Sequence, residues 1–337
     1  MTDTTEKTAL VLGATGGVGG EVAAELLRRG WRVNALARDP QAAAARWRRP
    51  ERGVDWLKGD AMDAGAVVAA AKGATLIVHA VNPPGYRDWD RLVLPMLENS
   101  IAAARASGAR LLLPGTVYNF GPDAFAAPGE NAPQNPTTRK GAIRVAMERR
   151  LRAVAAEGVR SLIVRAGDFF GPHAGNNWFS QGLVRPGRPV RAISVPGAPG
   201  IGHQWAYLPD VARTMVQLVE RGDALDAFAV FHMDGHWDAD GTEMSAAIRA
   251  ATGRPDLKVR RFPWWLVTLA APFVTTFREM GEMRYLWRVP LRMNNARLVA
   301  FLGAEPHTPL ADAMAETLAG LGCLPDPAGV PERRPAT

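Results

Sequence analysis

Short apolar runs alternate with longer amphipathic stretches along the first half of the chain. The amphipathic stretches carry apolar residues at three- and four-residue spacing, which is typical of helices, and the short runs between them are typical of buried strands. The pattern predicts strands at 9–12, 32–36, 54–57, 75–80, 110–113 and 160–165. It predicts helices near 17–29, 63–72, 88–107 and 138–157. Strands separated by helices indicate an α/β protein with a doubly wound parallel sheet.

The pattern changes after residue 165. Residues 171–202 are rich in Gly, Pro and Asn, which predicts irregular loops of the kind that line a ligand crevice. A helix beginning near Pro209 and the apolar run 228–233 predict a return to the sheet, followed by a smaller, mostly helical substrate region. The predicted division is a Rossmann domain at 1–170 and 205–235, a substrate region at 171–204 and 236–325, and a disordered tail at 326–337.

The longest apolar segment, 262–277, is shorter than the ~20 residues that span a bilayer, and Pro263 and Pro272 interrupt it. We interpret it as a lid or core helix over an apolar substrate pocket. Arginines flank it on both sides, so contact with a membrane surface is the alternative.

Composition narrows the class of protein. Among 337 residues, 47% are hydrophobic and 22% charged, which indicates a globular chain with its own core. The net charge of +7 fits an anionic partner without choosing among cofactor, nucleic acid and membrane. The single cysteine excludes an internal disulfide, no Cys/His cluster has zinc spacing, and the N-terminus is polar. We therefore expect a cytoplasmic protein without a metal site.

A basic run at 46–52 contains Trp47, a combination that nucleic-acid binders also show. The run is short, so we interpret it as a solvated surface and expect no nucleic-acid partner.

Glycines dominate the turn after the first predicted strand, TALVLGATGGVGG at 8–20. A strand, a glycine-rich turn and a helix form the context in which backbone N–H groups bind a dinucleotide pyrophosphate. The predicted cofactor contacts in this turn are Gly13, Thr15, Gly16, Gly17, Val18 and Gly19.

Arg38 lies about 20 residues beyond the last of these glycines, where an arginine accommodates the 2′-phosphate of NADP. The sequence therefore favours NADP(H). Asp39 could instead serve the ribose 2′-hydroxyl of NAD(H), which keeps that cofactor open.

Further motifs follow in a fixed order: GD at 59–60, VHA at 78–80, GT at 115–116, VRAGDFFGP at 164–172 and AYLPDVA at 206–212. Together with the glycine turn, they resemble the extended and atypical branches of the short-chain dehydrogenase/reductase superfamily. The resemblance implies that Asp60 meets the adenine, and it adds Ala80 and Asn82 to the expected cofactor contacts.

The superfamily's catalytic signature is a Ser or Thr after the fifth strand and a Tyr-x-x-x-Lys on the next helix. Thr116 fits the first position, whereas Lys140 occupies the tyrosine position and Arg144 the lysine position. Lys-x-x-x-Arg-x-x-x-Glu, ending at Glu148, is similar to the isoflavone reductase-like, or NmrA-like, branch. That resemblance implies a lysine acting as general acid or base.

Spacing of four places Lys140, Arg144 and Glu148 on one helical face. Burial, or a cationic neighbour such as Arg144, would lower the pKa of Lys140 into a useful range. A solvated stripe with an Arg144–Glu148 pair, or a cofactor contact by Lys140, are the alternatives. Tyr118 is a second candidate proton donor.

Candidate substrate contacts come from the Gly/Pro-rich segment. They are His173, Asn176 and Asn177, and His203 follows later as a weaker candidate. We therefore expect an NADPH-dependent oxidoreductase that reduces a small or medium apolar carbonyl or conjugated substrate. A sugar epimerase or dehydratase with tightly held NAD, and a non-catalytic NADP-sensing regulator, are the alternatives. The sequence does not identify the substrate, and it is compatible with a homodimer.

Overall fold

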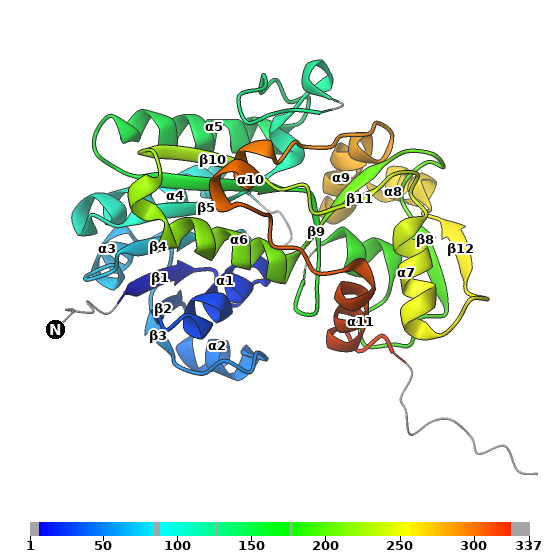
Figure 1. Ribbon diagram of the computed structural model, residues 1–337, viewed down its shortest axis with the longest axis horizontal. Helices are drawn as coiled ribbons and strands as arrows, with labels where there is room; N and C mark the ends of the chain where they lie inside the picture. Colours follow the sequence, from blue (N-terminus) through cyan, green and yellow to red (C-terminus); the bar gives the residue numbers. More distant parts are fainter. Residues whose placement is uncertain (1–6, 84–87, 126, 176, 325–337) are drawn as a thin grey trace, which may run out of the picture.

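A seven-stranded, all-parallel sheet forms the centre of the protein in the computed structural model, which describes residues 7–83, 88–125, 127–175 and 177–324 (Figure 1). The strand order is β10-β6-β5-β4-β1-β2-β3. Its strands are β1 (Thr8–Leu12), β2 (Arg32–Ala37), β3 (Val54–Lys58), β4 (Leu76–His79), β5 (Arg110–Thr116), β6 (Ser161–Ala166) and β10 (Phe228–His232). All six predicted strands and the predicted return at 228–233 are confirmed, and so is the doubly wound α/β class.

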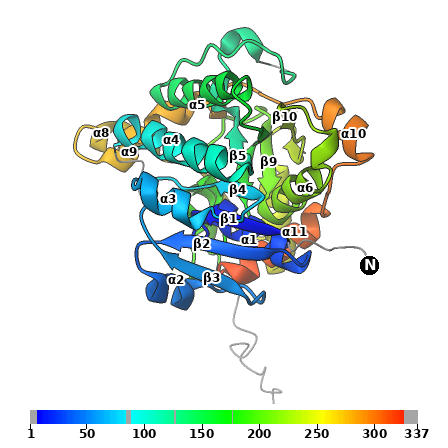
Figure 2. The same cartoon turned by 90° about the vertical axis from the view of Figure 1, so that its left-hand side faces the viewer.

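Helices cover both faces of this sheet. On one face, α1 (Gly17–Arg28) packs against α6 (Leu208–Glu220). On the other face, α4 (Trp89–Ser107) lies between α3 (Ala64–Ala70) and α5 (Arg139–Ala155). Figure 2 shows the two layers on opposite sides of the sheet.

Alternation along the strands explains the two layers. Val11 of β1 belongs to the core under α1, whereas Leu10 and Leu12 belong to the core under α4. Both faces of the sheet are therefore apolar, as in other parallel sheets covered by helices. The pattern did not predict α2 (Pro40–Arg46), a short Ala-rich helix that Asp39 caps.

A second apolar core lies beyond the carboxyl ends of the strands, with Phe170, Phe179, Trp205 and Trp287 at its centre. Two small sheets contribute to this core. One has three strands, β7 (Asp168–Phe170), β9 (His203–Tyr207) and β11 (His236–Asp238). The other has two strands, β8 (Ala192–Val195) and β12 (Lys258–Arg261). The helices of this core include α7 (Glu243–Thr252), α8 (Trp264–Ala270), α9 (Thr275–Glu282) and α11 (Leu310–Gly320), while α10 (Ala296–Leu302) packs on β10. The domain division stays a prediction, and the tail at 326–337 lies outside the described residues.

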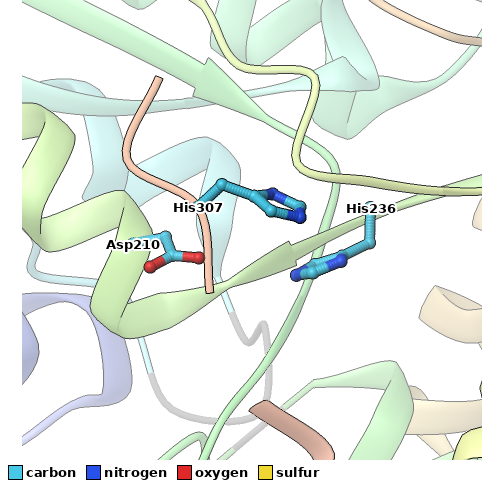
Figure 3. Close-up of side chains that lie close together, drawn as sticks. All are labelled: Asp210, His236 and His307. Atoms are coloured by element: carbon cyan, nitrogen blue, oxygen red, sulfur yellow. The ribbon is translucent and has the colours of Figure 1, made fainter. Parts of the chain in front are cut away.

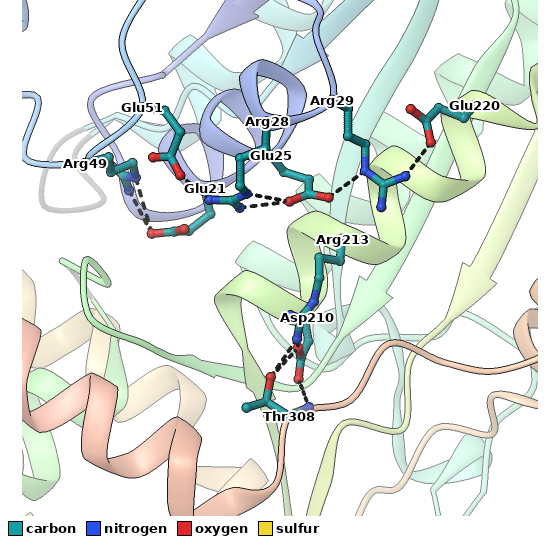
Figure 4. A network of polar contacts seen from close by, with 10 residues as sticks. All are labelled: Glu21, Glu25, Arg28, Arg29, Arg49, Glu51, Asp210, Arg213, Glu220 and Thr308. Atoms are coloured by element: carbon teal, nitrogen blue, oxygen red, sulfur yellow. Dashed lines mark hydrogen bonds and ion pairs between the residues drawn. The ribbon is translucent and has the colours of Figure 1, made fainter.

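Ion pairs join α1 to its surroundings (Figure 4). The guanidinium of Arg29 forms ion pairs with Glu25 on its own helix and with Glu220 at the end of α6. Arg49 is buried against Glu21, and its guanidinium occupies the space that a side chain at Gly20 would fill. The interpretation of 46–52 as a solvated surface is therefore wrong for Arg49, because a buried carboxylate balances its charge.

Within the described part of the chain, no helix is both long enough and apolar enough to cross a membrane.

Candidate active-site cleft

A cleft of about 1210 Å³ opens at the carboxyl ends of the central strands. One side is formed by the turn after β1, the ends of β2 and β3, and the segment after β4. The other side is formed by the end of β5, the start of α5, the loop after β7, and α9. Of the predicted site residues, the cleft is lined by Gly13, Thr15, Gly16, Gly17, Val18, Arg38, Asp60, Ala80, Asn82, Thr116, Tyr118, Lys140, His173 and Asn177.

The glycine turn has no room for side chains. Gly13 has a φ of +92°, and a Cβ there would lie 2.5 Å from the carbonyl oxygen of Ala80. Gly16 precedes α1 and provides no side-chain cap, so the first N–H groups of that helix are available to an anion. The turn therefore fits a dinucleotide pyrophosphate.

Gly19 has a different place. It does not line the cleft, and a Cβ there would lie 2.4 Å from the carbonyl oxygen of Gly13. The missing side chain at Gly19 lets α1 pack against the turn, and the direct cofactor contact of Gly19 stays a prediction.

Two charged residues follow β2, and both line the cleft. The Oδ1 atom of Asp39 accepts a hydrogen bond from the N–H of Ala42 at 3.0 Å, which caps α2. Its carboxylate therefore already has a structural role, whereas Arg38 is the cation that β2 delivers to the cleft. At the end of β3, Asp60 shapes the next loop by accepting from the N–H of Met62 at 3.0 Å.

Lys140 lies in the first turn of α5 and is only 4% exposed. Its Nζ atom lies 3.1 Å from Oε2 of Glu279 and donates to the carbonyl oxygen of Glu279, also at 3.1 Å. The N–H of Lys140 donates to Oε1 of Glu282 at 3.2 Å. Helix α9 is therefore fastened over the start of α5 by two carboxylates.

Burial lowers the pKa of Lys140, while the hydrogen bond and charge of Glu279 oppose that effect. The cation that also lowers this pKa is Arg139. The expected contribution of Arg144 stays a prediction. The alternative of a solvated stripe is wrong, because Lys140 and Glu148 are buried.

Glu148 is buried and does not pair with Arg144. Its Oε1 atom accepts from Nε of Arg165 at 3.0 Å, and Arg165 is 1% exposed. A buried guanidinium needs such a carboxylate, which explains why the expected Arg144–Glu148 surface pair is wrong. Arg144 instead donates to the carbonyl oxygen of Pro114 at 3.3 Å and lies over the ring of Trp89.

Thr116 ends β5, and its Oγ1 atom accepts from the N–H of Tyr118 at 3.3 Å. That contact uses an acceptor site of the hydroxyl and leaves its proton to donate into the cleft. A Cβ at Gly141 would lie 2.3 Å from the carbonyl oxygen of Tyr118, so the missing side chain lets α5 approach this turn closely. Thr116, Tyr118 and Lys140 thereby line the same cleft.

The substrate side is only partly as predicted. His173 lines the cleft, and burial lowers its pKa, which favours the neutral ring. Asn177 also lines the cleft, with Oδ1 accepting from the N–H of Ser180 at 2.8 Å. Asn176 lies outside the described residues. His203 does not line this cleft but is buried in β9.

Sequence reasoning missed Asp168 and Glu279 as cleft residues. Asp168 stood within a quoted motif, and its Oδ2 atom lies 2.8 Å from Nε2 of His203. His203 in turn stacks on Trp287 at 3.8 Å between ring centroids. No pattern in the sequence signals Glu279, which meets Lys140 only through the packing of α9.

A separate polar cluster lies at the start of α6 (Figure 3). Potential ligand atoms of Asp210, His236 and His307 lie within 4.8 Å of one another. The carboxylate of Asp210 already accepts from Thr308 and pairs with Arg213 (Figure 4). Since that cation balances its charge, we interpret the cluster as a junction between α6, β11 and the segment before α11.

Comparisons with known proteins agree with this geometry. Residues 9–233 match the model of the NAD dependent epimerase/dehydratase family. The chain is 30% identical to 3-diazoavenalumate denitrifying reductase of Streptomyces sp over 311 residues, which cover 86% of this chain and 90% of the reductase. It is 37% identical to isoflavone reductase homolog IRL of Zea mays over 89 residues, covering 25% of this chain and 29% of that protein.

Among solved structures, UDP-glucose 4-epimerase from Brucella ovis in complex with NAD has a TM-score of 0.72. The match covers 94% of this chain and 98% of the epimerase at 17% identity, so it shows a shared fold.

Proposed function

This chain belongs to the NAD-dependent epimerase/dehydratase family, and on that premise we propose that it is an NADPH-dependent reductase with Lys140 as general acid. Family membership makes it an enzyme of the NAD(P)-dependent oxidoreductase type. The proposed substrate is a small or medium apolar carbonyl or conjugated compound. The observation that carries the proposal is the buried ammonium of Lys140 inside the cleft, held by Glu279.

The cofactor end of the cleft supports a nicotinamide dinucleotide. The crowded glycine turn fits a pyrophosphate, and relatives of this fold are described with NAD bound. Arg38 supports NADP, because a guanidinium pairs well with a 2′-phosphate. The local capping role of Asp39 weakens the case for an NAD-specific ribose contact.

The bound cofactor would supply the hydride for the substrate carbon. Lys140 would donate a proton from Nζ to the substrate oxygen, or to the carbon that gains it in a conjugated substrate. Burial favours this step because it lowers the pKa of the Lys140 ammonium, which makes it a stronger acid than a lysine in water. Glu279 keeps the ammonium populated before transfer, since its carboxylate stabilises the charged form.

Thr116 would orient the reacting oxygen through its hydroxyl proton, and Tyr118 lies in the same wall as a second donor. Arg144 would place positive charge near the substrate oxygen as negative charge develops there. Met280, Met283 and Trp178 line the cleft as well, which supports an apolar substrate.

Epimerase or dehydratase chemistry on a nucleotide sugar is the second candidate, because structural relatives include such enzymes. The tyrosine of the Tyr-x-x-x-Lys signature is replaced by Lys140 here. A reductase consumes NADPH stoichiometrically with product, whereas an epimerase converts a nucleotide sugar without net consumption.

The test is NADPH oxidation by the purified chain with a panel of aldehydes, ketones, enones and quinones, beside a panel of nucleotide sugars. Reduction of one panel member with matching NADPH loss supports the proposal. Binding of NADPH without consumption on any compound would favour the cofactor-sensing alternative, and sugar interconversion would favour the epimerase.

A further inference from the structure

Large apolar side chains stand exposed on α8 and in the turn that follows it. Trp265 and Leu269 are each 67% exposed, Leu266 is 43% exposed and Phe273 is 88% exposed. We call these four residues the α8 patch. Exposure of this many large apolar groups on one short segment marks an interaction site.

The direction of the α8 patch is fixed by the inner side of the same helix. Val267 is buried, and Nε1 of Trp264 donates to the carbonyl oxygen of Pro196 at 2.8 Å. Trp265 and Leu269 lie four residues apart on α8, so they form one outward stripe, and Phe273 is exposed in the turn after the helix. The chain therefore presents this stripe in its folded state.

Positive charge borders the α8 patch. In β12, which precedes α8, all residues are exposed, and three of the four are Lys258, Arg260 and Arg261. Arg278 of α9 follows the patch with 60% of its side chain exposed. Figure 1 shows β12, α8 and α9 at the same end of the molecule.

We propose that this end of the protein binds the surface of an anionic lipid bilayer. The α8 patch would insert among the headgroups and upper acyl chains, while the cations of β12 contact lipid phosphates. Helix α8 has seven residues, so it would lie in the interface and not cross the bilayer.

Charge favours a bilayer over a second copy of this chain. A two-fold contact through the α8 patch would bring two basic β12 strands to one interface, where like charges repel. An anionic bilayer offers both apolar depth and negative charge.

The proposed membrane contact adds to the proposed reaction and does not depend on it. It does share an element with the cleft, because α9 carries Glu279 and Met280, which line it. A bilayer at this end would place an apolar substrate source beside the helix that covers Lys140.

The test is co-sedimentation of the full chain with vesicles of phosphatidylcholine alone, or of phosphatidylcholine mixed with phosphatidylglycerol. We expect binding to the mixed vesicles, weaker binding in high salt, and little binding to phosphatidylcholine alone. Phe273→Ser should weaken binding at least tenfold, while Val299→Ser, which changes an exposed valine on α10, should leave it unchanged.

Charge reversal provides the second variant. Arg260→Glu should lower the partition coefficient about tenfold on anionic vesicles, and Arg149→Glu on the outer side of α5 should not. Absence of binding to mixed vesicles overturns the proposal. So does a concentration-dependent dimer in sedimentation velocity that Phe273→Ser converts to monomer while vesicle binding persists.

Discussion

The Nζ atom of Lys140 lies 3.1 Å from Oε2 of Glu279, although 139 positions separate the two residues in the chain. The contact joins the start of α5, at the end of the parallel sheet, to α9 in the second core. A shift of α9 that moves Glu279 would therefore change the environment of the Lys140 ammonium, which we propose as the acid.

Glu279→Gln removes a negative charge that raises the pKa of Lys140, so burial, which lowers this pKa, is opposed less strongly although Glu282 still raises it. The pKa of Lys140 should fall further. Reduction needs the protonated ammonium, so the alkaline limb of kcat/KM against pH should move to lower pH. Glu243→Gln on the exposed side of α7 is the matched control. An alkaline limb unchanged by Glu279→Gln would contradict the proposed coupling.

Arg38→Ser should weaken NADPH binding by about tenfold to a hundredfold, because a charge-assisted contact with the 2′-phosphate is lost. Binding of NADH should stay within about twofold, since NADH lacks that phosphate. Calorimetric titration of both cofactors measures the difference, with Arg48→Ser as a control outside the cleft lining. Equal losses of affinity for NADPH and NADH would show that Arg38 does not contact the 2′-phosphate.

Gly13→Ala should abolish cofactor binding, because the new Cβ would lie 2.5 Å from the carbonyl oxygen of Ala80. Gly73→Ala is the matched control. Gly73 has a similar positive φ, +75°, but nothing lies within 4 Å of its Cβ position. Both variants should lose about 1 kcal/mol of stability from backbone strain, and only Gly13→Ala should lose more. Retention of normal NADPH affinity in Gly13→Ala would rule out the proposed cradle.

Burial lowers the pKa of His79 to about 3, with a further contribution from Arg144. The unfolded chain binds a proton at His79 below about pH 6.5, whereas the folded chain does not until about pH 3. The contribution of the neutral His79 to the free energy of unfolding is therefore fully present above pH 6.5 and is lost as the pH falls toward 3. His79→Asn removes this loss while an amide can still bond Ser100, the partner of Nδ1.

Between pH 7 and pH 5, the free energy of unfolding should fall about 2 kcal/mol less in His79→Asn than in the parent chain. Urea unfolding at the two pH values measures it. Equal falls in both proteins would show that His79 titrates normally in the folded state.

The parallel sheet could be predicted because its strands and helices carry local periodicity, and the glycine turn could be predicted because its chemistry is written in consecutive residues. Thr116 and Lys140 were identified through family spacing. Glu279 could not be predicted, since its role depends on how α9 packs against α5, and the apolar pattern at 262–277 predicts only a lid or core helix.

Burial was the other quantity that the pattern could not supply. Lys140, Arg144 and Glu148 share a helical spacing, yet each has a different partner, because Arg165 takes Glu148 and Pro114 accepts from Arg144. Spacing alone could not separate a solvated stripe from a buried acid.

The most direct test of the account is Lys140→Arg, assayed on a substrate found in the panel. Arginine keeps a positive charge beside Glu279 but does not release a proton at accessible pH. We predict that turnover falls by about 10²- to 10⁴-fold while NADPH binding stays within a few fold, with the exposed Lys72→Arg unchanged. Full turnover by Lys140→Arg would contradict the claim that Lys140 donates the proton.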